Sequence, residues 1–307
     1  MLRRVNPARS LASLASLVSL ASLMSIGCGS GSASSAIADA GADAAPPRTT
    51  PDPQFLPKAT GACPAFTSGK NTFAPAGIAP RDVLLSIGAE ADASDGPLVF
   101  FWHGTGGDPS DAIGALGPAI AGVTAEGGIV AAPYHDPASG ELPWFQAIGG
   151  DRDDDLRVAD EILACAIAVK GVDLRRIHSV GFSAGAMNTA QFALRRSGYV
   201  ASIVLYSGAQ IDEVDPEDAT NEYAAMLFYG GPSDQVVVDF DDASHAYHDW
   251  LTANGHFSFL CDHGRGHTVP SDGRASAWQF LQDHPFGVHP EPYAAALPAG
   301  FPSYCGL

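Results

Sequence analysis

The sequence is poor in positive charge. Its 307 residues include 16 Lys and Arg against 34 Asp and Glu, which gives a formal net charge of −18. A nucleic-acid partner is therefore not expected, because phosphate binding needs a basic footprint. Charged residues make up only 16% of the chain and hydrophobic residues 46%, which excludes a chain that is disordered throughout. We expect one sizeable folded domain with appendages.

Metal-binding spacings are also missing. The cysteines form no C-x-x-C pair and no Cys/His cluster with zinc spacing. The Gly-rich stretch 103–107 lacks the Lys-Ser or Lys-Thr pair that a phosphate-binding loop requires. Internal repeats and a second folded domain are not evident either. We therefore expect neither a metal nor another cofactor.

No apolar run is long enough to span a bilayer. Arginines precede a Leu-Ala-Ser run at residues 11–26, which falls short of the roughly 20 residues that a bilayer core demands. This three-part form predicts a secretory signal at residues 1–27. Ser25-Ile26-Gly27-Cys28 resembles a bacterial lipobox, so we expect Cys28 to carry lipid and to anchor an exported protein at the outer membrane or cell surface. Ser25 stands where Leu is usual, and secretion without lipid is the alternative.

Residues 28–60 contain almost no large apolar side chain and are rich in Gly, Ser, Ala, Asp and Pro. Such a segment buries too little to offset the entropy of ordering it. We predict a flexible tether, and we assign residues 61–307 to the folded, catalytic domain.

Four cysteines follow the lipobox: Cys63, Cys165, Cys261 and Cys305. An even count in an exported chain favours disulfides, and buried free thiols are the alternative. The sequence allows three pairings. We prefer Cys261 with Cys305, because Cys305 lies in a Pro- and Gly-rich tail that needs fastening, and this leaves Cys63 for Cys165.

Short apolar runs alternate with helical patterns after residue 61. This order predicts an α/β fold with a mostly parallel sheet and helices on both faces. Pro118 leaves the extent of a helix after Asp111 open. We expect strands at 83–87, 98–102, 129–132, 177–182, 202–206, 224–229 and 256–261, and helices at 154–170, 186–196, 241–254 and 273–283.

The motif Gly181-Phe182-Ser183-Ala184-Gly185 follows an expected strand and precedes an expected helix. This is the context of a nucleophile elbow, in which small residues allow a strained turn and leave the serine oxygen exposed. A Gly-rich turn without function is the alternative. We predict that Ser183 is a nucleophile.

A second Gly-rich loop, His103-Gly104-Thr105-Gly106-Gly107, follows the strand expected at 98–102. Its backbone N–H groups can point to the place where a tetrahedral oxyanion forms. We predict the Thr105 and Ala184 amides as donors, with Gly104 as the alternative to Thr105. His103 is predicted to hold the loop by hydrogen bonds rather than to act as the base.

An acid and a base are expected after the nucleophile in the chain. Asp234 lies just beyond the strand expected at 224–229, where open α/β sheets place functional groups. His267 lies in a loop after the last expected strand, and we predict that it is the base. Asp212 and Asp215 are the alternative acids, and His263 is the alternative base.

Together, the stretches 181–187 (GFSAGAM), 231–236 (GPSDQV), 266–270 (GHTVP) and the HGTGGD loop resemble secreted esterases of the polyhydroxybutyrate depolymerase and feruloyl esterase group. The resemblance implies an α/β-hydrolase fold, a Ser-Asp-His triad, no metal, and substrates that are esters of hydroxy acids or of aromatic acids on plant polysaccharide. Ala184 stands where many members have Asn, and Val269 where many have Trp.

We therefore predict an exported serine esterase that hydrolyses carboxylic esters, with polyhydroxyalkanoate-, feruloyl- or acetyl-ester-like substrates, through an acyl-serine intermediate. The substrate can be polymeric, and membrane contact is expected only through the lipid anchor. A serine peptidase of the same fold and a non-catalytic, polymer-binding surface lipoprotein are the alternatives.

Overall fold

Runs of apolar residues form the central strands. In the computed structural model, which describes residues 52–147, 150, 152–210 and 214–307, these strands belong to one unit, Pro46–Leu307. Every residue of the central strands is buried apart from Phe182. Apolar side chains on both faces are typical of parallel strands covered by helices on both sides. These strands are β3 (Leu98–Trp102), β4 (Ile129–Pro133), β5 (Ile177–Phe182), β6 (Ser202–Tyr206) and β7 (Ala224–Tyr229).

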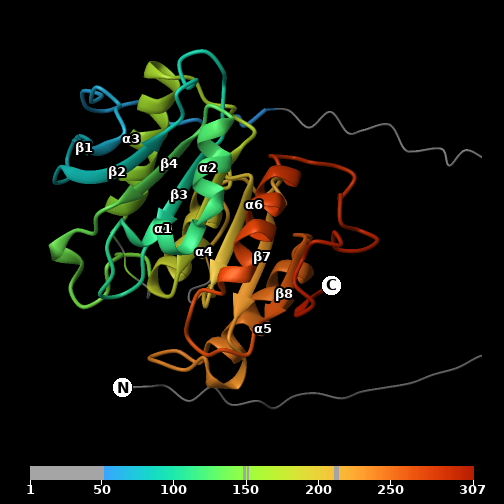
Figure 1. Ribbon diagram of the computed structural model, residues 1–307. Coiled ribbons are helices and arrows are strands. Elements are labelled where there is room, and N and C mark those ends of the chain that lie inside the picture. The colour runs from blue at the N-terminus through green and yellow to red at the C-terminus, as the bar shows by residue number, and fades with distance from the viewer. Residues whose placement is uncertain (1–51, 148–149, 151, 211–213) are drawn as a thin grey trace, which may run out of the picture. The chain divides into compact units, whose positions relative to one another are not determined.

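Four further strands complete a sheet of nine with the order β1-β2-β4-β3-β5-β6-β7-β8-β9. They are β1 (Gly69–Phe73), β2 (Arg81–Ile87), β8 (Ser258–Asp262) and β9 (Cys305–Gly306). Strand β2 pairs antiparallel with β1 and β4, and β9 pairs antiparallel with β8, whereas the strands from β4 to β8 are parallel. Figure 1 shows the twisted sheet between its helices.

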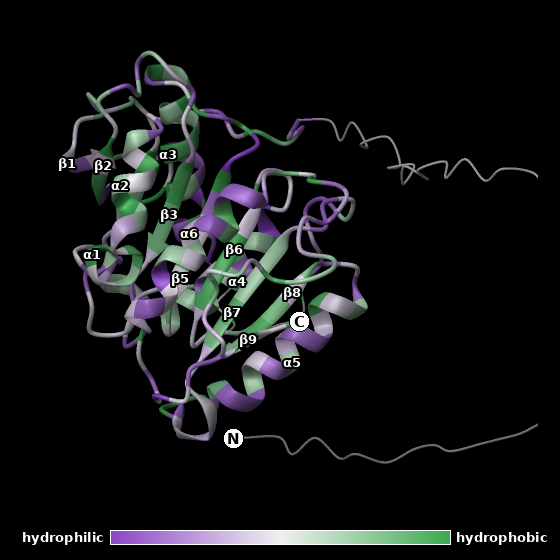
Figure 2. Cartoon of the chain, turned by 45° about the vertical axis from the view of Figure 1, so that its right-hand side comes forward, coloured by the Kyte–Doolittle hydropathy of each residue, from purple (hydrophilic) through white to green (hydrophobic). Residues whose placement is uncertain are grey.

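Helices cover both faces of the sheet, and the sheet separates the core into two clusters, one on each face. One face carries α1 (Asp111–Leu116), α2 (Pro118–Ala125) and α6 (Arg274–Asp283), and the other carries α3 (Asp154–Val169), α4 (Ala184–Arg195) and α5 (Phe240–Ala253). Short 3-10 turns occur at Pro137–Ser139, Gly231–Ser233 and Ser271–Gly273. Figure 2 shows the strands as the more hydrophobic layer, with hydrophilic residues along the helices.

The expected fold class and the seven expected strands are present, with small changes at their ends. Pro118 does not limit one helix but begins a second, where its missing N–H has no intrahelical role. The last long strand begins at Ser258 rather than at residue 256, because the backbone N–H of His256 donates to the Leu251 carbonyl in the preceding helix at 3.0 Å. Strands β1 and β9 were not expected.

Two disulfides fasten the ends of the described chain. Cys63 bonds to Cys165 of α3, and Cys261 of β8 bonds to Cys305 of β9. This is the pairing preferred from the sequence, and it is typical of proteins that fold in an oxidising compartment. In the described residues, no helix is long and apolar enough to cross a membrane. The expected signal, the lipid site Cys28 and most of the tether lie outside the described residues.

The carboxyl ends of the parallel strands lie along one edge of the sheet. Ser183 follows β5 directly, and Ser207 follows β6. Asp234 follows β7 after the turn Gly231–Ser233, and His267 lies in the loop after β8. Open α/β sheets place ligands at this edge. The topology thus collects side chains that are far apart in the sequence.

Candidate active site

The turn at Ser183 is a strained one. Ser183 has φ 56° and ψ −123°, a backbone conformation that residues other than glycine rarely adopt. A Cβ atom on Gly181 would lie 2.2 Å from the Gly185 carbonyl oxygen, and a Cβ on Gly185 would lie 1.9 Å from the Trp102 carbonyl oxygen. Only glycine therefore fits at these two positions, and the close packing holds the serine at the end of β5.

The side chains of Ser183, His267 and Asp234 form one hydrogen-bonded chain. His267 Nε2 lies 2.9 Å from Ser183 Oγ, and His267 Nδ1 lies 2.7 Å from Asp234 Oδ1. Because an ionised carboxylate only accepts hydrogen bonds, Nδ1 carries the proton, and Nε2 is left to accept the hydrogen of the serine hydroxyl. The arrangement can take a proton from Ser183 and return it to another oxygen or nitrogen.

Asp234 is buried and hydrogen-bonded on both carboxylate oxygens. Its Oδ2 accepts hydrogen bonds from the Ser207 hydroxyl at 2.7 Å and from the Gly230 N–H at 2.9 Å. Burial alone would raise the pKa of Asp234, but the hydrogen bonds from His267, Ser207 and Gly230 together lower the pKa below its ordinary value. Asp234 is therefore ionised at neutral pH.

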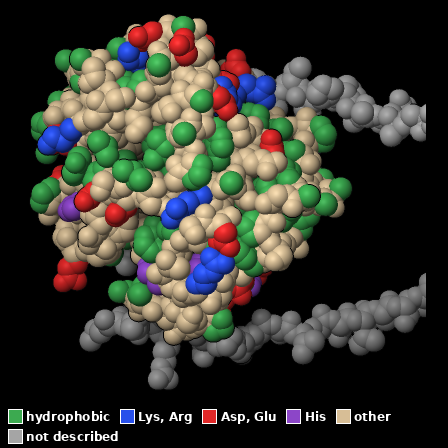
Figure 3. Space-filling view, viewed as in Figure 1, with side chains coloured by type: hydrophobic (Ala, Val, Ile, Leu, Met, Phe, Trp, Pro, Cys, Tyr) green, Lys and Arg blue, Asp and Glu red, His purple; other side chains and the backbone are tan. Residues whose placement is uncertain are grey.

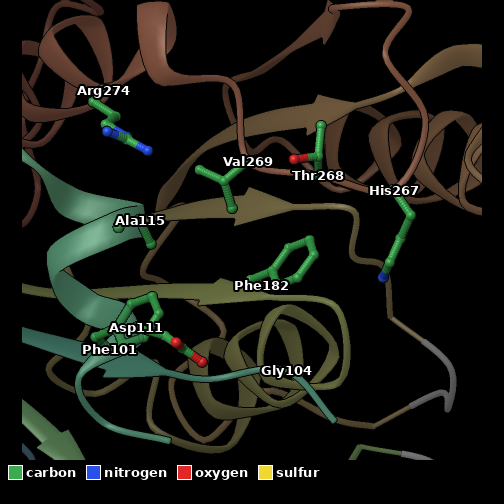
Figure 4. Close-up of a pocket in the computed structure, with 10 residues that line it drawn as sticks. Phe101, Gly104, Asp111, Ala115, Phe182, His267, Thr268, Val269 and Arg274 are labelled. Carbon is green, nitrogen blue, oxygen red and sulfur yellow. The ribbon is translucent and has the colours of Figure 1, made fainter. Parts of the chain in front are cut away.

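Two aromatic rings hold the imidazole of His267. The Phe240 ring stacks on it with a centroid separation of 5.1 Å, and the Phe182 ring lies tilted at 4.9 Å. Figure 4 shows Phe182 and His267 side by side along the wall of a pocket. These contacts limit ring rotation, so the two nitrogens stay directed at their partners.

The loop after β3 passes close to the serine. A Cβ on Gly104 would lie 3.2 Å from the Ser183 Cβ. His103 is buried, donates from Nδ1 to the Gly104 carbonyl at 2.8 Å, and has its own carbonyl bound by Trp144 Nε1 at 2.8 Å. Burial lowers the pKa of His103, which keeps its ring neutral. These contacts fit the predicted loop-holding role of His103.

The two amides predicted as oxyanion donors belong to this loop and to α4. Ala184 is the first residue of α4, and the first N–H groups of a helix have no acceptor within it. Thr105 is exposed and follows Gly104 in the loop. The choice between the Thr105 and Gly104 amides stays a prediction.

The alternative acid and base residues are not part of the hydrogen-bonded chain. The Nδ1 atom of His263 accepts the Arg265 N–H at 3.2 Å within its own loop, and its Nε2 has no partner among the described residues. Asp215 is exposed on the surface, and Asp212 lies outside the described residues.

Sequence reasoning missed Ser207, for which the only signal is a Ser-Gly pair at the carboxyl end of a strand.

A cavity of about 370 Å³ opens beside His267. Its wall is made by the Gly-rich loop, α1, the end of β5 and the segment from His267 to α6 (Figure 4). Apolar and charged side chains both contribute: Phe101, Gly104, Asp111, Gly114, Ala115, Phe182, His267, Thr268, Val269 and Arg274. Within the part of the chain that the structure describes, no group of three or more His, Cys, Asp or Glu could hold a metal ion.

Solved structures share this fold. The native pOPH structure is 20% identical and has a TM-score of 0.64, and the match covers 80% of this chain and 96% of that one. A carboxylesterase from Bacillus cereus is 17% identical with a TM-score of 0.52, over 66% of this chain and 93% of that one. Esterase PE8 is 23% identical with a TM-score of 0.50, over 65% and 97% of the two chains.

Comparison with family models and with curated proteins gives no match. At these identities the solved structures establish architecture rather than chemistry. The order and direction of the nine strands, the two helical layers and the neighbouring esterase structures agree with the resemblance found in the sequence. The chain has the α/β-hydrolase fold.

Proposed function

We propose that this protein is a serine hydrolase that cleaves carboxylic esters through an acyl-Ser183 intermediate. The observation that carries the proposal is the continuous hydrogen-bonded chain from Ser183 through His267 to Asp234, with steps of 2.9 and 2.7 Å. A serine hydroxyl is a weak nucleophile until a base at hydrogen-bond distance takes its proton. His267 is at that distance, and its ring is held in place.

In the first half of the reaction, His267 Nε2 takes the proton of Ser183 as the serine oxygen attacks the ester carbonyl. The carbonyl oxygen becomes an oxyanion, which the Ala184 and Thr105 N–H groups stabilise, each by about 3 kcal/mol in the transition state. The tetrahedral intermediate then collapses. The bond to the alcohol oxygen breaks, and His267 donates its proton to that oxygen.

In the second half, a water molecule replaces the alcohol. His267 takes a proton from the water, the hydroxide attacks the acyl carbon, and the proton returns to Ser183 as the acid leaves. Asp234 stays ionised throughout, because three hydrogen bonds stabilise its charge. It fixes the tautomer of His267 and stabilises the transient imidazolium.

The pocket beside His267 can take an apolar part of an ester. Phe101, Phe182 and Val269 supply apolar wall, and Val269 leaves space where many members of the resembled family have Trp. Esters of hydroxy acids, of feruloyl groups and of acetyl groups are the proposed substrates, and the substrate can be a polymer. A non-catalytic polymer-binding role is disfavoured, because such a role needs no aligned triad.

A fluorophosphonate probe together with chromogenic substrates tests the proposal. Wild-type protein should become labelled on Ser183 and should hydrolyse p-nitrophenyl esters, whereas Ser183→Ala should lose both, with turnover reduced by about 10⁴ to 10⁶ at unchanged folding. Faster cleavage of the matched p-nitroanilide would favour a serine peptidase. Labelling without any turnover would favour the binding role.

We also propose that the protein is exported and held at the outer membrane or cell surface. Residues 1–27 would be the signal, Cys28 the lipid-bearing residue and residues 28–60 the tether, and secretion without lipid is the alternative. The disulfides support export, since they are rare in reducing compartments. Membrane fractionation tests the anchor: Cys28→Ser should release the protein, because membrane residence depends on its acyl chains. Free wild-type protein in the medium with an unmodified N-terminus would contradict the proposal.

A further inference from the structure

One cation in the pocket has no partner. Arg274 and His267 line the same cavity. No residue that the structure describes makes a hydrogen bond or ion pair with the Arg274 guanidinium. Its Nε is buried and unsatisfied. A buried donor without an acceptor costs free energy, more so when it is charged. The Nε of Arg274 therefore has no acceptor among the described residues, and a ligand in the pocket can supply one.

The fold makes room for this side chain at some cost. A Cβ at Gly117, between α1 and α2, would lie 2.8 Å from the Arg274 Cδ, so the absence of a side chain at Gly117 leaves space for the arginine stem. Arg274 is also the first residue of α6, where the helix dipole disfavours positive charge. Positions that break local rules in this way are expected at functional sites.

The acid on the pocket wall does not neutralise Arg274. Asp111 Oδ2 accepts the Asp108 N–H at 3.1 Å, within the loop that it follows. Figure 4 shows Asp111 near Gly104, on the other side of the pocket from Arg274. By contrast, Arg265, in the same segment as His267, is bound by both oxygens of Asp272 at 2.8 and 2.7 Å. The chain thus pairs one arginine fully and leaves the other for the pocket.

The surroundings also select the kind of ligand. The whole chain carries a net charge of −18, and its repulsion of an anion grows with the charge of that anion, so a polyanion is disfavoured more than a monoanion. On the face that α1, α2 and α6 cover, basic side chains are few and separated (Figure 3), so no broad patch attracts a polyanion. A single guanidinium at the end of a cavity with Val269, Phe182 and Ala115 on its walls matches one carboxylate on a short apolar stem.

We propose that the pocket recognises esters that also carry a free carboxylate, and that Arg274 binds this carboxylate while Ser183 attacks the ester carbonyl. This inference rests on the proposed esterase function and narrows its substrate class. The carboxylate can belong to the acyl part, as in a half-ester of a dicarboxylic acid, or to the alcohol part, as in an acylated hydroxy acid. The experiment separates these two sources.

The first test compares substrates in matched pairs. One pair is the p-nitrophenyl half-ester of glutaric acid and its neutral carboxamide, and the other is the butyrate ester of 3-hydroxybenzoic acid and its carboxamide. Wild-type protein should prefer the anionic member of one pair in kcat/KM, and Arg274→Gln should reduce that preference about 10- to 100-fold. Arg274→Lys should retain part of it. The pair that responds identifies the part of the ester that carries the charge.

Arg265→Gln is the matched control, because it removes the same charge from a side chain that already has a partner. It should leave the preference for the anionic substrate unchanged. A wild-type protein with no preference in either pair, or a preference that Arg274→Gln retains, would overturn the inference.

A second measurement is independent of turnover. Monomethyl glutarate is titrated by calorimetry into Ser183→Ala protein and into the Ser183→Ala, Arg274→Gln double variant, with dimethyl glutarate as the neutral ligand. Binding of the monoanion that depends on Arg274 would support the pocket even if no ester were hydrolysed, in which case the esterase proposal alone would fail. Ester hydrolysis without Arg274-dependent binding or preference would reject the carboxylate site and leave the esterase intact.

Discussion

The hydroxyl of Ser207 donates a 2.7 Å hydrogen bond to Oδ2 of Asp234, on the oxygen that does not face His267. Ser207 has φ 51°, so it holds a strained backbone at the end of β6 as Ser183 does at the end of β5. With the Gly230 N–H and His267 Nδ1, it gives Asp234 three hydrogen-bond donors. Ser207 is buried and bonds to Asp234, so it can act on the orientation of His267 through that carboxylate.

Replacing Ser207 tests this positioning role. Ser207→Gly and Ser207→Ala should both reduce kcat/KM for a neutral ester by about 10-fold or more, because a hydrogen bond to a charged group is worth about 1.5 to 3 kcal/mol. They should differ in stability, because glycine tolerates the positive φ at this position. The free energy of unfolding should be about 1 kcal/mol higher for the Gly variant than for the Ala variant. Kinetics and urea unfolding measure the two effects separately. Activity that follows stability would make Ser207 merely structural.

Asp234→Asn should reduce turnover by up to about 10⁴. The amide can donate a hydrogen bond to Nδ1, which leaves the wrong tautomer of His267 facing Ser183. Asp215→Asn, on the exposed loop after β6, is the control and should change turnover little, and the same is expected of Asp212→Asn. A large loss in either control with a small loss in Asp234→Asn would move the acid to that loop.

The same carboxylate should make stability depend on pH. Because the pKa of Asp234 is lowered in the folded protein, its contribution to stability is present above the ordinary carboxyl pKa and is lost as the pH falls through the folded value. Urea unfolding between pH 7 and pH 3 should therefore show a loss of stability in wild-type protein at the acidic end that is smaller in Asp234→Asn.

His178 contributes to pH dependence over a higher range. It lies buried in β5, where burial, together with Arg176 and His284, lowers its pKa to about 3. Between the ordinary pKa of histidine and about pH 3, His178 binds a proton in the unfolded chain but not in the folded chain. The free energy of unfolding therefore falls as the pH falls. His178→Asn keeps an acceptor or donor for Ser202 but removes this proton. Over this range the free energy of unfolding should fall less steeply with decreasing pH in the variant than in wild type, and the two slopes should differ by about 1.4 kcal/mol per pH unit. Equal slopes in the two proteins would contradict this.

The disulfide between Cys261 and Cys305 should support the loop that carries His267. It closes a sequence separation of 44 residues, and its loss in Cys305→Ser should lower stability by up to about 4 kcal/mol, as seen in the thermal midpoint. Activity should fall at a temperature where the variant is still folded, because β9 no longer fixes the end of β8. Cys63→Ser is the control. It should lower stability while leaving the activity of folded molecules near that of wild type.

Most of the fold could be predicted because burial on both faces of a parallel strand requires apolar residues in sequence. Stretches such as Leu98–Trp102 and Ala224–Tyr229 therefore stand out without any periodicity. The hydrogen-bonded residues Ser183, Asp234 and His267 could be selected as candidates for a related reason. Each lies just after such a strand, and the order along the chain follows the order of the sheet.

The missed elements lack these signals. Strand β1 alternates buried and exposed positions through polar residues, and β9 has only two residues, which a partner strand and a disulfide stabilise. Ser207 and Arg274 are single residues whose roles depend on what the fold brings beside them. No local pattern distinguishes them from the other serines and arginines of the chain.

The two ends of the sheet are protected against other chains in different ways. The edge strand β1 carries the exposed, charged side chain of Lys70, and such charges discourage pairing with a strand of a second molecule. At the opposite end, β9 covers only Leu260 and Cys261 of β8. If the disulfide is reduced, the tail can detach and leave the backbone groups of Leu260 and Cys261 without their partners in β9. This uncovered edge can pair with the edge of another molecule, so the disulfide would protect against aggregation as well as against unfolding.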